Sequence, residues 1–353
     1  MVNREKITAT GGTNMGQLGF FDIEKKLQAL SELGDPLERL AQAIDWQQFK
    51  PVIVKAFRKE RKSNAGRPPF DYLMMFKIIV LQHMYNLSDA QTQFQLIDRF
   101  SFRRFIGAGA EDTIPDEKTI WLFRETLTRT GTVKKLFALF GRFLDNAGYQ
   151  AKKGMIVDAS IIEVPRQRNT IEENRQVKQG AVPPAWKDQA AKLRQKDTDA
   201  RWTKKGTETY YGYKDHINVD VKHKLIRKYE VTPAHVHDSQ EADALLDPAN
   251  TRQAIWGDSA YCSEEIRDLL RKRRIKNHIH RKGYRDHALT PFQQAMNKKK
   301  SSIRARVEHI FGRISFLIGR WIRCIGLARA RAKIGLLNLV YNMNRFTYLV
   351  NHA

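Results

Sequence analysis

The chain has 353 residues, 62 of them Lys or Arg and 38 of them Asp or Glu, so its formal net charge is +24. A chain of this length is expected to form two or three domains with a sizeable core. Because 42% of the residues are hydrophobic, the composition predicts a globular protein rather than a disordered one. The positive charge predicts a polyanionic partner, most simply nucleic acid. A basic protein without such a partner stays an open alternative.

The two cysteines, Cys262 and Cys324, stand in no metal-type spacing, which argues against both a disulfide framework and a zinc finger. Free thiols suit a reducing interior. The first residues lack the apolar core of a signal peptide, and no uncharged apolar run approaches the length of a membrane span. We therefore expect a cytoplasmic protein with no membrane partner.

Residues 1–19 show no apolar periodicity and predict a flexible arm, whereas the spacing over 20–150 predicts an all-helical domain. Asp35 followed by Pro36 is typical of a helix start. Ser88 and Gln91 have the spacing of a capping box. The stretch "PPFDYLMMFKIIVLQHMY" is apolar nearly all round and predicts the buried central helix of this domain.

The helix expected after Pro115 has two interpretations. It could be the DNA-reading helix of a helix-turn-helix, with four exposed side chains: Lys118, Thr119, Trp121 and Arg124. It could instead be a bundle helix with Ile120 and Phe123 in the core, and the periodicity favours this second interpretation.

From residue 151 onward the pattern changes. "GMIVDASIIEV" predicts a strand, and "YYGYKDHINVDVKHKLIRKYEVTPA" predicts a hairpin that turns near His223. Between them, residues 166–209 form a polar insertion with two isolated tryptophans, Trp186 and Trp202. A helix at "SQEADALL", a short strand ending in Asp258, a helix at "SEEIRDLLRKRR", a strand-like "IKNHIH" and a long helix over 299–321 follow. This order predicts an α/β domain with a mixed sheet over 151–353.

Three acidic residues stand out from the basic background. We expect Asp158 at the end of the first strand, Asp258 at the end of a later strand, and Glu308 beside the apolar stripe of the long helix. Buried together they would repel and lose their charge, unless divalent cations bind them. Mg²⁺ prefers such oxygens, and two ions about 4 Å apart would clamp a phosphoryl displacement. Each acid could also be a helix cap or a salt-bridge partner.

The residues around these acids resemble bacterial insertion-sequence transposases of the DDE type, in the insertion-sequence-five group. The resemblance runs from about residue 19 to near the C-terminus. The matching stretches are "GFFDIEKKLQALSELGDPLERLAQAIDW", "GRPPFDYLMMFKIIVLQ", "IPDEKTIWLFRETL", "MIVDASIIEVPRQRN", "KDTDARWTKKGTETYYGYKDHINVD", "AIWGDSAY", "RARVEHIFGRI" and "GLARARAKIGLLNLVYNMNR".

The resemblance implies a ribonuclease-H-like catalytic domain preceded by a helical domain for DNA-end binding and assembly. Asp158, Asp258 and Glu308 would be catalytic residues and ligands of two Mg²⁺ or Mn²⁺ ions. The implied activity is metal-dependent cleavage of double-stranded DNA at terminal inverted repeats, followed by strand transfer to target DNA. A homodimer or larger assembly on DNA, at the bacterial nucleoid, is also implied.

The family signature around the glutamate is Tyr, two residues, Arg, three residues, Glu, six residues, Lys. Arg304 and Glu308 fit it, whereas Ser301 and Ser315 replace the tyrosine and the lysine. The missing phosphate contacts would then come from other cations: Arg306, Arg313 or Arg320. The matching "YGYKDH" places Lys214 and His216 either beside the active site or on an exposed hairpin face, and both placements stay open.

Cations are dense on either side of Asp258 and Glu308. We expect six of them to position DNA through its phosphates without reading bases: Arg271, Arg273, Arg274, Lys299, Lys300 and Arg304. Trp186 and Trp202 would stack on or wedge between bases near the cut, or only pin the insertion to its domain.

Two other functions compete with a carboxylate enzyme. "HIH" at 278–280 with Tyr284, or "HVH" at 235–237, fits a nuclease that binds one metal through histidines and links DNA to a tyrosine. The chain could also be an inactive or repurposed DNA-binding protein. A metal-dependent cleavage assay on terminal inverted-repeat DNA would distinguish it from an enzyme.

Overall fold

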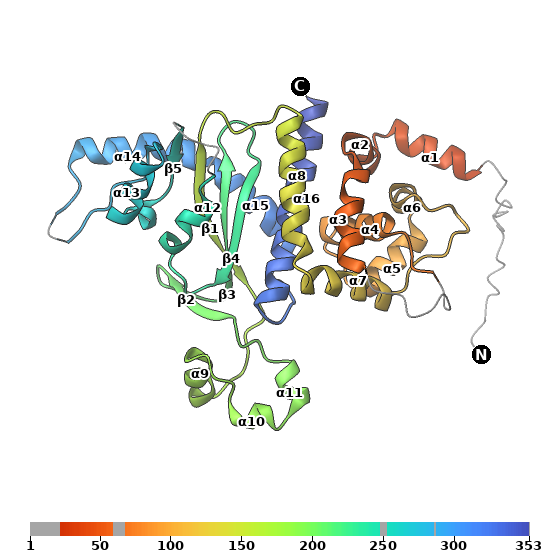
Figure 1. The fold of residues 1–353 in the computed structure, drawn as a ribbon, viewed down its shortest axis with the longest axis horizontal. Coiled ribbons are helices and arrows are strands. Elements are labelled where there is room, and N and C mark those ends of the chain that lie inside the picture. The colour runs from red at the N-terminus through yellow and green to blue at the C-terminus, as the bar shows by residue number, and fades with distance from the viewer. Residues whose placement is uncertain (1–21, 59–67, 248–252, 286, 353) are drawn as a thin grey trace, which may run out of the picture.

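The computed structural model describes residues 22–58, 68–247, 253–285 and 287–352, so the arm expected at 1–19 lies outside the described residues. The first part of the chain is helical, as predicted, and the last of its helices lies beside a mixed sheet (Figure 1). Its elements are α1 (Asp22–Glu32), α2 (Pro36–Ala43), η1 (Trp46–Phe49), α3 (Lys50–Phe57), α4 (Tyr72–Met84), α5 (Asp89–Asp98), α6 (Phe100–Ile106), α7 (Glu117–Arg129) and α8 (Thr132–Asn146).

Local signals set the starts of these helices. The Asp35 carboxylate accepts a 2.9 Å hydrogen bond from the Leu37 N–H, with Pro36 in the first turn of α2. Ser88 and Gln91 form both halves of the predicted capping box of α5. Helix α4 is buried on nearly every side, as its continuous apolar sequence indicates.

Among the described residues, no helix is both long and apolar enough to cross a bilayer.

Within the part of the chain that the structure describes, six strands pair into one continuous sheet. They are β1 (Met155–Glu163), β2 (Arg201–Lys205), β3 (Glu208–Asp220), β4 (Ile226–Pro233), β5 (Ala254–Trp256) and β6 (Lys276–Asn277). Strand β3 pairs in antiparallel fashion with β1, with β4 and, at its start, with β2. Strand β5 pairs in parallel with β1, and β6 pairs in parallel with β5. The predicted hairpin is therefore β3–β4, and the mixed sheet is confirmed.

The sequence predicted that β1 would end at Asp158, but the strand continues beyond this residue. It continues to Glu163 because β3 pairs with it over its whole length, whereas β5 pairs with only Met155 and Ile156. The start of β1 is held against β5 by Gly154, whose φ of 100° favours glycine. A Cβ at this position would lie 2.5 Å from the Trp256 ring.

The polar insertion is not a loop, because it folds into three short helices before β2 begins. These are α9 (Ile171–Lys178), α10 (Pro184–Lys187) and α11 (Ala190–Arg194), which hang below the sheet (Figure 1). Trp186 is fully buried among them, and its indole N–H donates a 2.6 Å hydrogen bond to Glu173. The Lys196 ammonium lies 5.0 Å from its ring. The expectation that Trp186 touches DNA is wrong, because the ring is the core of the insertion.

Two helices replace the single long helix expected over 299–321. α14 (Pro291–Arg304) and α15 (Arg306–Ile318) are separated at Ala305. The remaining elements are η2 (Asp238–Glu241), α12 (Ala242–Leu245), η3 (Ser259–Tyr261), α13 (Glu264–Lys272) and α16 (Leu327–Asn351). Helix α16, the longest described element, was not predicted from the sequence.

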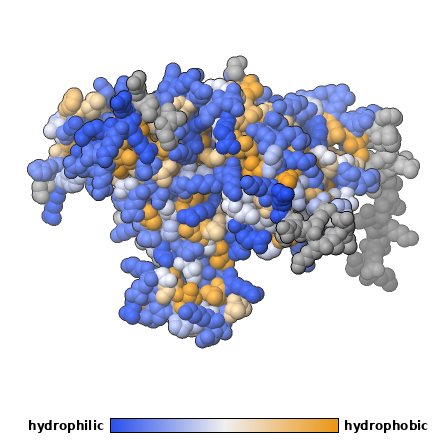
Figure 2. All heavy atoms as spheres, viewed as in Figure 1, coloured by the Kyte–Doolittle hydropathy of each residue, from blue (hydrophilic) through white to orange (hydrophobic). Residues whose placement is uncertain are grey.

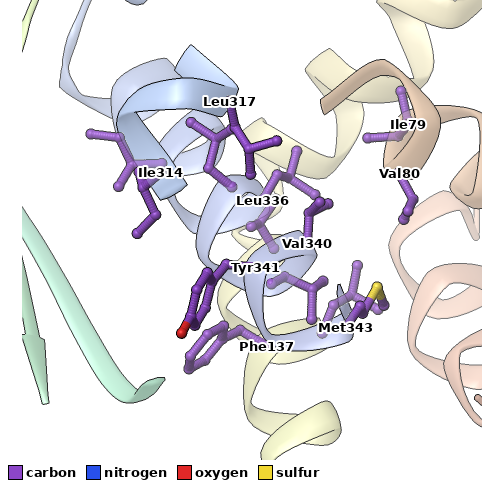
Figure 3. Packing of buried hydrophobic residues seen from close by; sticks show 14 of the residues in the cluster. Ile79, Val80, Phe137, Ile314, Leu317, Leu336, Val340, Tyr341 and Met343 are labelled. Carbon is purple, nitrogen blue, oxygen red and sulfur yellow. The ribbon is translucent and has the colours of Figure 1, made fainter. Parts of the chain in front are cut away.

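Helix α16 joins the helical region to the sheet. Its buried Leu336, Val340 and Met343 lie between Ile314 and Leu317 of α15 on one side and the α4 helix on the other (Figure 3). Residues of both regions form one hydrophobic cluster. Because burial of apolar surface contributes about 25 cal/mol per Å², this shared core stabilises the contact between the two regions.

Helix α16 also covers the outer edge of the sheet. The Asn342 amide accepts from the Ile226 N–H and donates to the Ile226 carbonyl of β4, both at 2.8 Å. Arg331 donates to the Val231 carbonyl of the same strand at 3.2 Å. Backbone groups on a strand edge otherwise invite pairing with another chain, so these contacts protect β4.

Replacing Asn342 with Ala should lower the free energy of unfolding by about 2–3 kcal/mol, because one buried N–H and one buried C=O would lose their partners. Chemical denaturation measures the change. The matched control is Asn351→Ala, an exposed amide on the same helix, which should have little effect. Equal midpoints for the two variants would contradict a structural role for the Asn342 contacts.

Candidate active site

Asp158, Asp258 and Glu308 line one cleft of about 400 Å³. Asp158 projects from β1, Asp258 caps η3 by accepting a 2.9 Å hydrogen bond from the Ala260 N–H, and Glu308 lies in the first turn of α15. In the parallel ladder Met155 faces Ile255 and Ile156 faces Trp256. The same register, continued two residues further, puts Asp158 beside Asp258. The folded chain therefore brings together three acids that are 100 and 50 residues apart in sequence.

Asp158 is the buried member of the three, with only 8% of its surface exposed. Burial raises the pKa of its carboxyl group to about 6, against the opposing effects of Arg304 and of the Ala159 N–H, and the neighbouring Asp258 raises it further. One carboxylate oxygen accepts from the Ala159 N–H at 2.9 Å, and the other accepts from Arg304 at 2.7 Å. Both oxygens thus have a donor.

Arg304 supplies the positive charge between the acids. Its guanidinium lies 2.7 Å from Asp158 and 3.8 Å from Glu308, which is itself largely exposed. Within the described residues, no three Asp, Glu, His or Cys side chains converge closely enough to hold a metal ion as they stand. The donor chemistry nevertheless fits a hard divalent cation, because three carboxylates face one water-accessible cleft. A cation bound there would replace Arg304 as the positive charge that compensates the carboxylates.

The cleft also holds residues that the sequence analysis missed. Strand β2 contributes Thr203, Lys204 and Lys205, and Asp238 enters from the start of η2. No local motif marks them, because β2 reaches the cleft only through its pairing with β3.

Lys214 lies in the same cleft as the three acids, which agrees with the first of the two placements considered for it. It lines the cleft, where its ammonium donates to the Asp238 carboxylate at 2.8 Å and to the Val236 carbonyl at 2.7 Å.

His216 has no exposed surface, so the exposed hairpin face considered for it is wrong, and its side chain is no DNA contact in this structure. Its Nε2 is 2.8 Å from the Thr232 hydroxyl, and its Nδ1 is 3.9 Å from the Asp238 carboxylate. Burial lowers the pKa of His216 to about 4, which keeps the ring neutral at neutral pH. Its contacts with Thr232 and Asp238 support the wall of the cleft instead.

Helix α7 follows the bundle interpretation. Ile120 and Phe123 are buried, while Lys118 and Trp121 are exposed. Arg124 is not free to read DNA, because its guanidinium donates to Asp89 at 2.9 Å through one nitrogen and to Gln82 at 2.7 Å through the other. The predicted exposure of Arg124 is therefore wrong.

The predicted phosphate-binding cations are spread beyond the cleft. Arg304 alone among them lines it. Arg271, Arg274 and Lys299 are exposed, Arg273 pairs with Asp243, and Lys300 donates to the Ile279 carbonyl at 2.8 Å. Most of the visible surface over α13 and α14 is hydrophilic (Figure 2).

The remaining candidates lie on α15 and β2. Arg306 donates to the Val221 carbonyl at 2.8 Å, and Arg313 lies 5.0 Å from the exposed Phe316 ring. Trp202 is 46% exposed on β2, with Arg166 5.4 Å from its ring, so it remains accessible for stacking.

The histidine motifs do not form one site. The His278 ring stacks on Trp256 at 5.0 Å, whereas the His280 Nε2 lies 3.4 Å from the Ser301 hydroxyl. In the other motif, the His237 Nδ1 is 2.8 Å from the Ser239 hydroxyl. These three rings thus each have a local contact partner.

Comparison with known families shows the family of this chain. Residues 149–343 match the family described as Transposase DDE domain, and residues 25–126 match the one described as Transposase domain (DUF772). The first match covers more than half of the chain. This chain belongs to the DDE transposase family, a class of nucleic-acid-processing enzymes, and the prediction of an insertion-sequence DDE transposase is confirmed at that level.

One solved structure is similar over most of the chain. It is described as a piggyBac transposase synaptic complex with hairpin DNA. The two chains share 12% sequence identity at a TM-score of 0.45, over 92% of this chain and 77% of the other. A likeness this distant carries no argument about the site.

The buried Asp158 predicts a pH-dependent stability. Because its pKa of about 6 in the folded chain exceeds the ordinary 3.8, the charged form is disfavoured by folding. This destabilisation is complete above pH 6, fades as the pH falls, and is absent below 3.8. In the presence of EDTA, Asp158→Asn should therefore raise the free energy of unfolding near neutral pH by about 1–3 kcal/mol.

Denaturation at a series of pH values measures the difference between Asp158→Asn and the wild-type chain. The difference should shrink toward pH 4. Glu265→Gln, an exposed change on α13, is the control and should show no such trend. A pH-independent difference for Asp158→Asn would contradict the proposed burial of this carboxylate.

Proposed function

We propose that the cleft is the active site of a DNA transposase of the insertion-sequence-five group, which cleaves DNA at the ends of an insertion sequence and transfers the freed strand to a target. The observation that carries this proposal is the register that sets Asp158 beside Asp258, with Glu308 lining the same cleft. Membership in the DDE family supports it.

Asp158, Asp258 and Glu308 would hold divalent cations, Mg²⁺ or Mn²⁺, with two ions per site. Such ions supply Lewis-acid polarisation of a phosphodiester and activation of water. Backbone contacts orient two of these ligands: the Ala159 N–H binds one oxygen of Asp158 on β1, and the Ala260 N–H at the start of η3 binds Asp258.

The cations of the cleft would position the phosphodiester. Lys214 is held by Asp238 at 2.8 Å, so its ammonium is fixed beside the acids rather than mobile. Lys204 and Lys205 enter from β2 and face the same space. We infer that Arg304 moves from Asp158 to a DNA phosphate when divalent cations bind, because the carboxylate then has another partner.

The wider fold supports the same proposal. The antiparallel meander β1–β3–β4, with parallel β5 and β6 beside β1, supports a ribonuclease-H-like domain. The exposed cations of α13 and α14, including Arg271, Arg274 and Lys299, would follow the DNA backbone without reading sequence. A homodimer or larger assembly at the nucleoid would hold two element ends together.

Substitution of the acids tests the catalytic assignment. Asp158→Asn, Asp258→Asn and Glu308→Gln should each lower Mg²⁺-dependent cleavage of DNA carrying the element ends by at least about 1,000-fold, because each removes an anionic ligand. Filter binding should show unchanged DNA affinity within about threefold. Glu265→Gln is the matched control and should cleave normally. Robust cleavage by any of the three would remove that residue from the site.

The products distinguish a carboxylate enzyme from a tyrosine nuclease. The proposed reaction leaves no covalent protein–DNA link, so a denaturing gel of labelled DNA should show free strands only. A protein-linked band that disappears in Tyr284→Phe would contradict the proposal.

A further inference from the structure

A second and larger cleft, of about 910 Å³, lies between the helical region and the segment that follows α15. Its walls come from the end of α4, the start of α5, α7, residues 318–325 and the first turns of α16. Figure 1 shows this segment at the lower end of α15 and α16, beside α7. None of the three active-site acids lines this cleft.

The charges in this second cleft are unbalanced. Its two acids are already paired, since Asp89 bonds with Arg124, and Glu125 accepts two hydrogen bonds from Arg329 at 2.9 and 3.0 Å. Three further cations line the cleft and take part in none of the ion pairs among the described residues: Arg320, Arg323 and Lys333.

Lys333 is the most enclosed of these cations. Burial, followed by the charge of Arg124, lowers the pKa of Lys333 to about 8. Only part of its side chain is accessible, through the cleft itself. An anion that enters the cleft would supply the charge compensation that burial takes from Lys333.

Aromatic side chains complete the walls. Trp121 is 46% exposed on α7, and the Arg320 guanidinium lies 4.5 Å from the Trp321 ring, which holds it at the surface. The cleft thus combines fixed positive charge with flat apolar surfaces, a combination that suits a sugar–phosphate backbone.

We propose that this second cleft binds the DNA backbone, through Arg320, Arg323 and Lys333, at a distance from the cut. The inference rests on the proposed function for its ligand. Helix α15 links the two sites: the ten residue steps from Glu308 to Ile318 span about 15 Å at about 1.5 Å per step. Along one DNA strand this is roughly four to five base steps of 3.4 Å.

The test uses a labelled 30-base-pair duplex of random sequence, which needs no knowledge of the element ends. Arg320→Gln with Arg323→Gln is the first double variant, because both side chains are exposed and the fold should tolerate the change. Lys333→Gln is the second variant. The matched control is Lys135→Gln with Arg142→Gln, two exposed cations on α8.

The double variant should bind the duplex roughly tenfold more weakly at 0.1 M salt, and the slope of log affinity against log salt should fall by about 0.9 for each lost phosphate contact. Lys333→Gln should lose about one such contact. The control should keep the wild-type slope within error. Unchanged affinity and slope in the double variant would overturn the inference.

Two further outcomes separate this inference from the proposed function. If the wild-type chain cleaves DNA and the double variant binds with the wild-type slope, the second cleft is not a DNA site and the active site still stands. If the double variant loses affinity although the wild-type chain cleaves nothing, the cleft is a DNA site and the catalytic proposal fails. The double variant without DNA could also sediment differently from the wild-type chain while its DNA affinity stays unchanged. This result would assign the cleft to contact with a second copy of the chain and overturn the inference.

Discussion

The parallel pairing of β1 with β5 is the constraint on which the site depends. Only Met155 and Ile156 pair with β5, yet this short ladder fixes the register that brings Asp158 level with Asp258. A slip of one residue would turn Asp158 to the opposite face of the sheet. Close packing holds the register: a Cβ on Gly257 would lie 3.2 Å from the Val157 side chain, so the two backbones stay close beyond the last ladder pair.

Charge balance follows from this placement. Burial and the neighbouring Asp258 raise the pKa of Asp158, and Arg304 holds its carboxylate in the absence of a metal ion. The apolar stripe of α15, which is packed against α16, fixes the helix that carries Glu308. The same helix leads from the acids to the second cleft, so one rigid element sets the distance between the proposed site of cleavage and the proposed site of backbone binding.

The sequence predicted those features that depend on neighbours in the chain. The caps at Asp35 and Ser88, the β3–β4 hairpin and the helical first part required only local spacing. Predictions from the sequence failed where contacts between distant segments determine the structure. Arg124 is tied to Asp89 across two helices, and Trp186 finds its core only because the insertion folds. Helix α16 was missed because its apolar residues face several partners and leave no single stripe. The three acids were singled out by their expected positions at strand ends and on a helix, and the family resemblance implied their roles, whereas the approach of Asp158 to Asp258 depends on the β1–β5 register.

Calorimetric titration with Mn²⁺, without DNA, tests most directly whether these acids form a cation site in which Arg304 is the competing charge. We expect the wild-type chain to bind Mn²⁺, Asp258→Asn to bind at least about tenfold more weakly, and Arg304→Gln to bind more tightly, because the guanidinium no longer occupies Asp158. Equal Mn²⁺ affinity in all three proteins, or none in any of them, would contradict a shared metal site at these carboxylates.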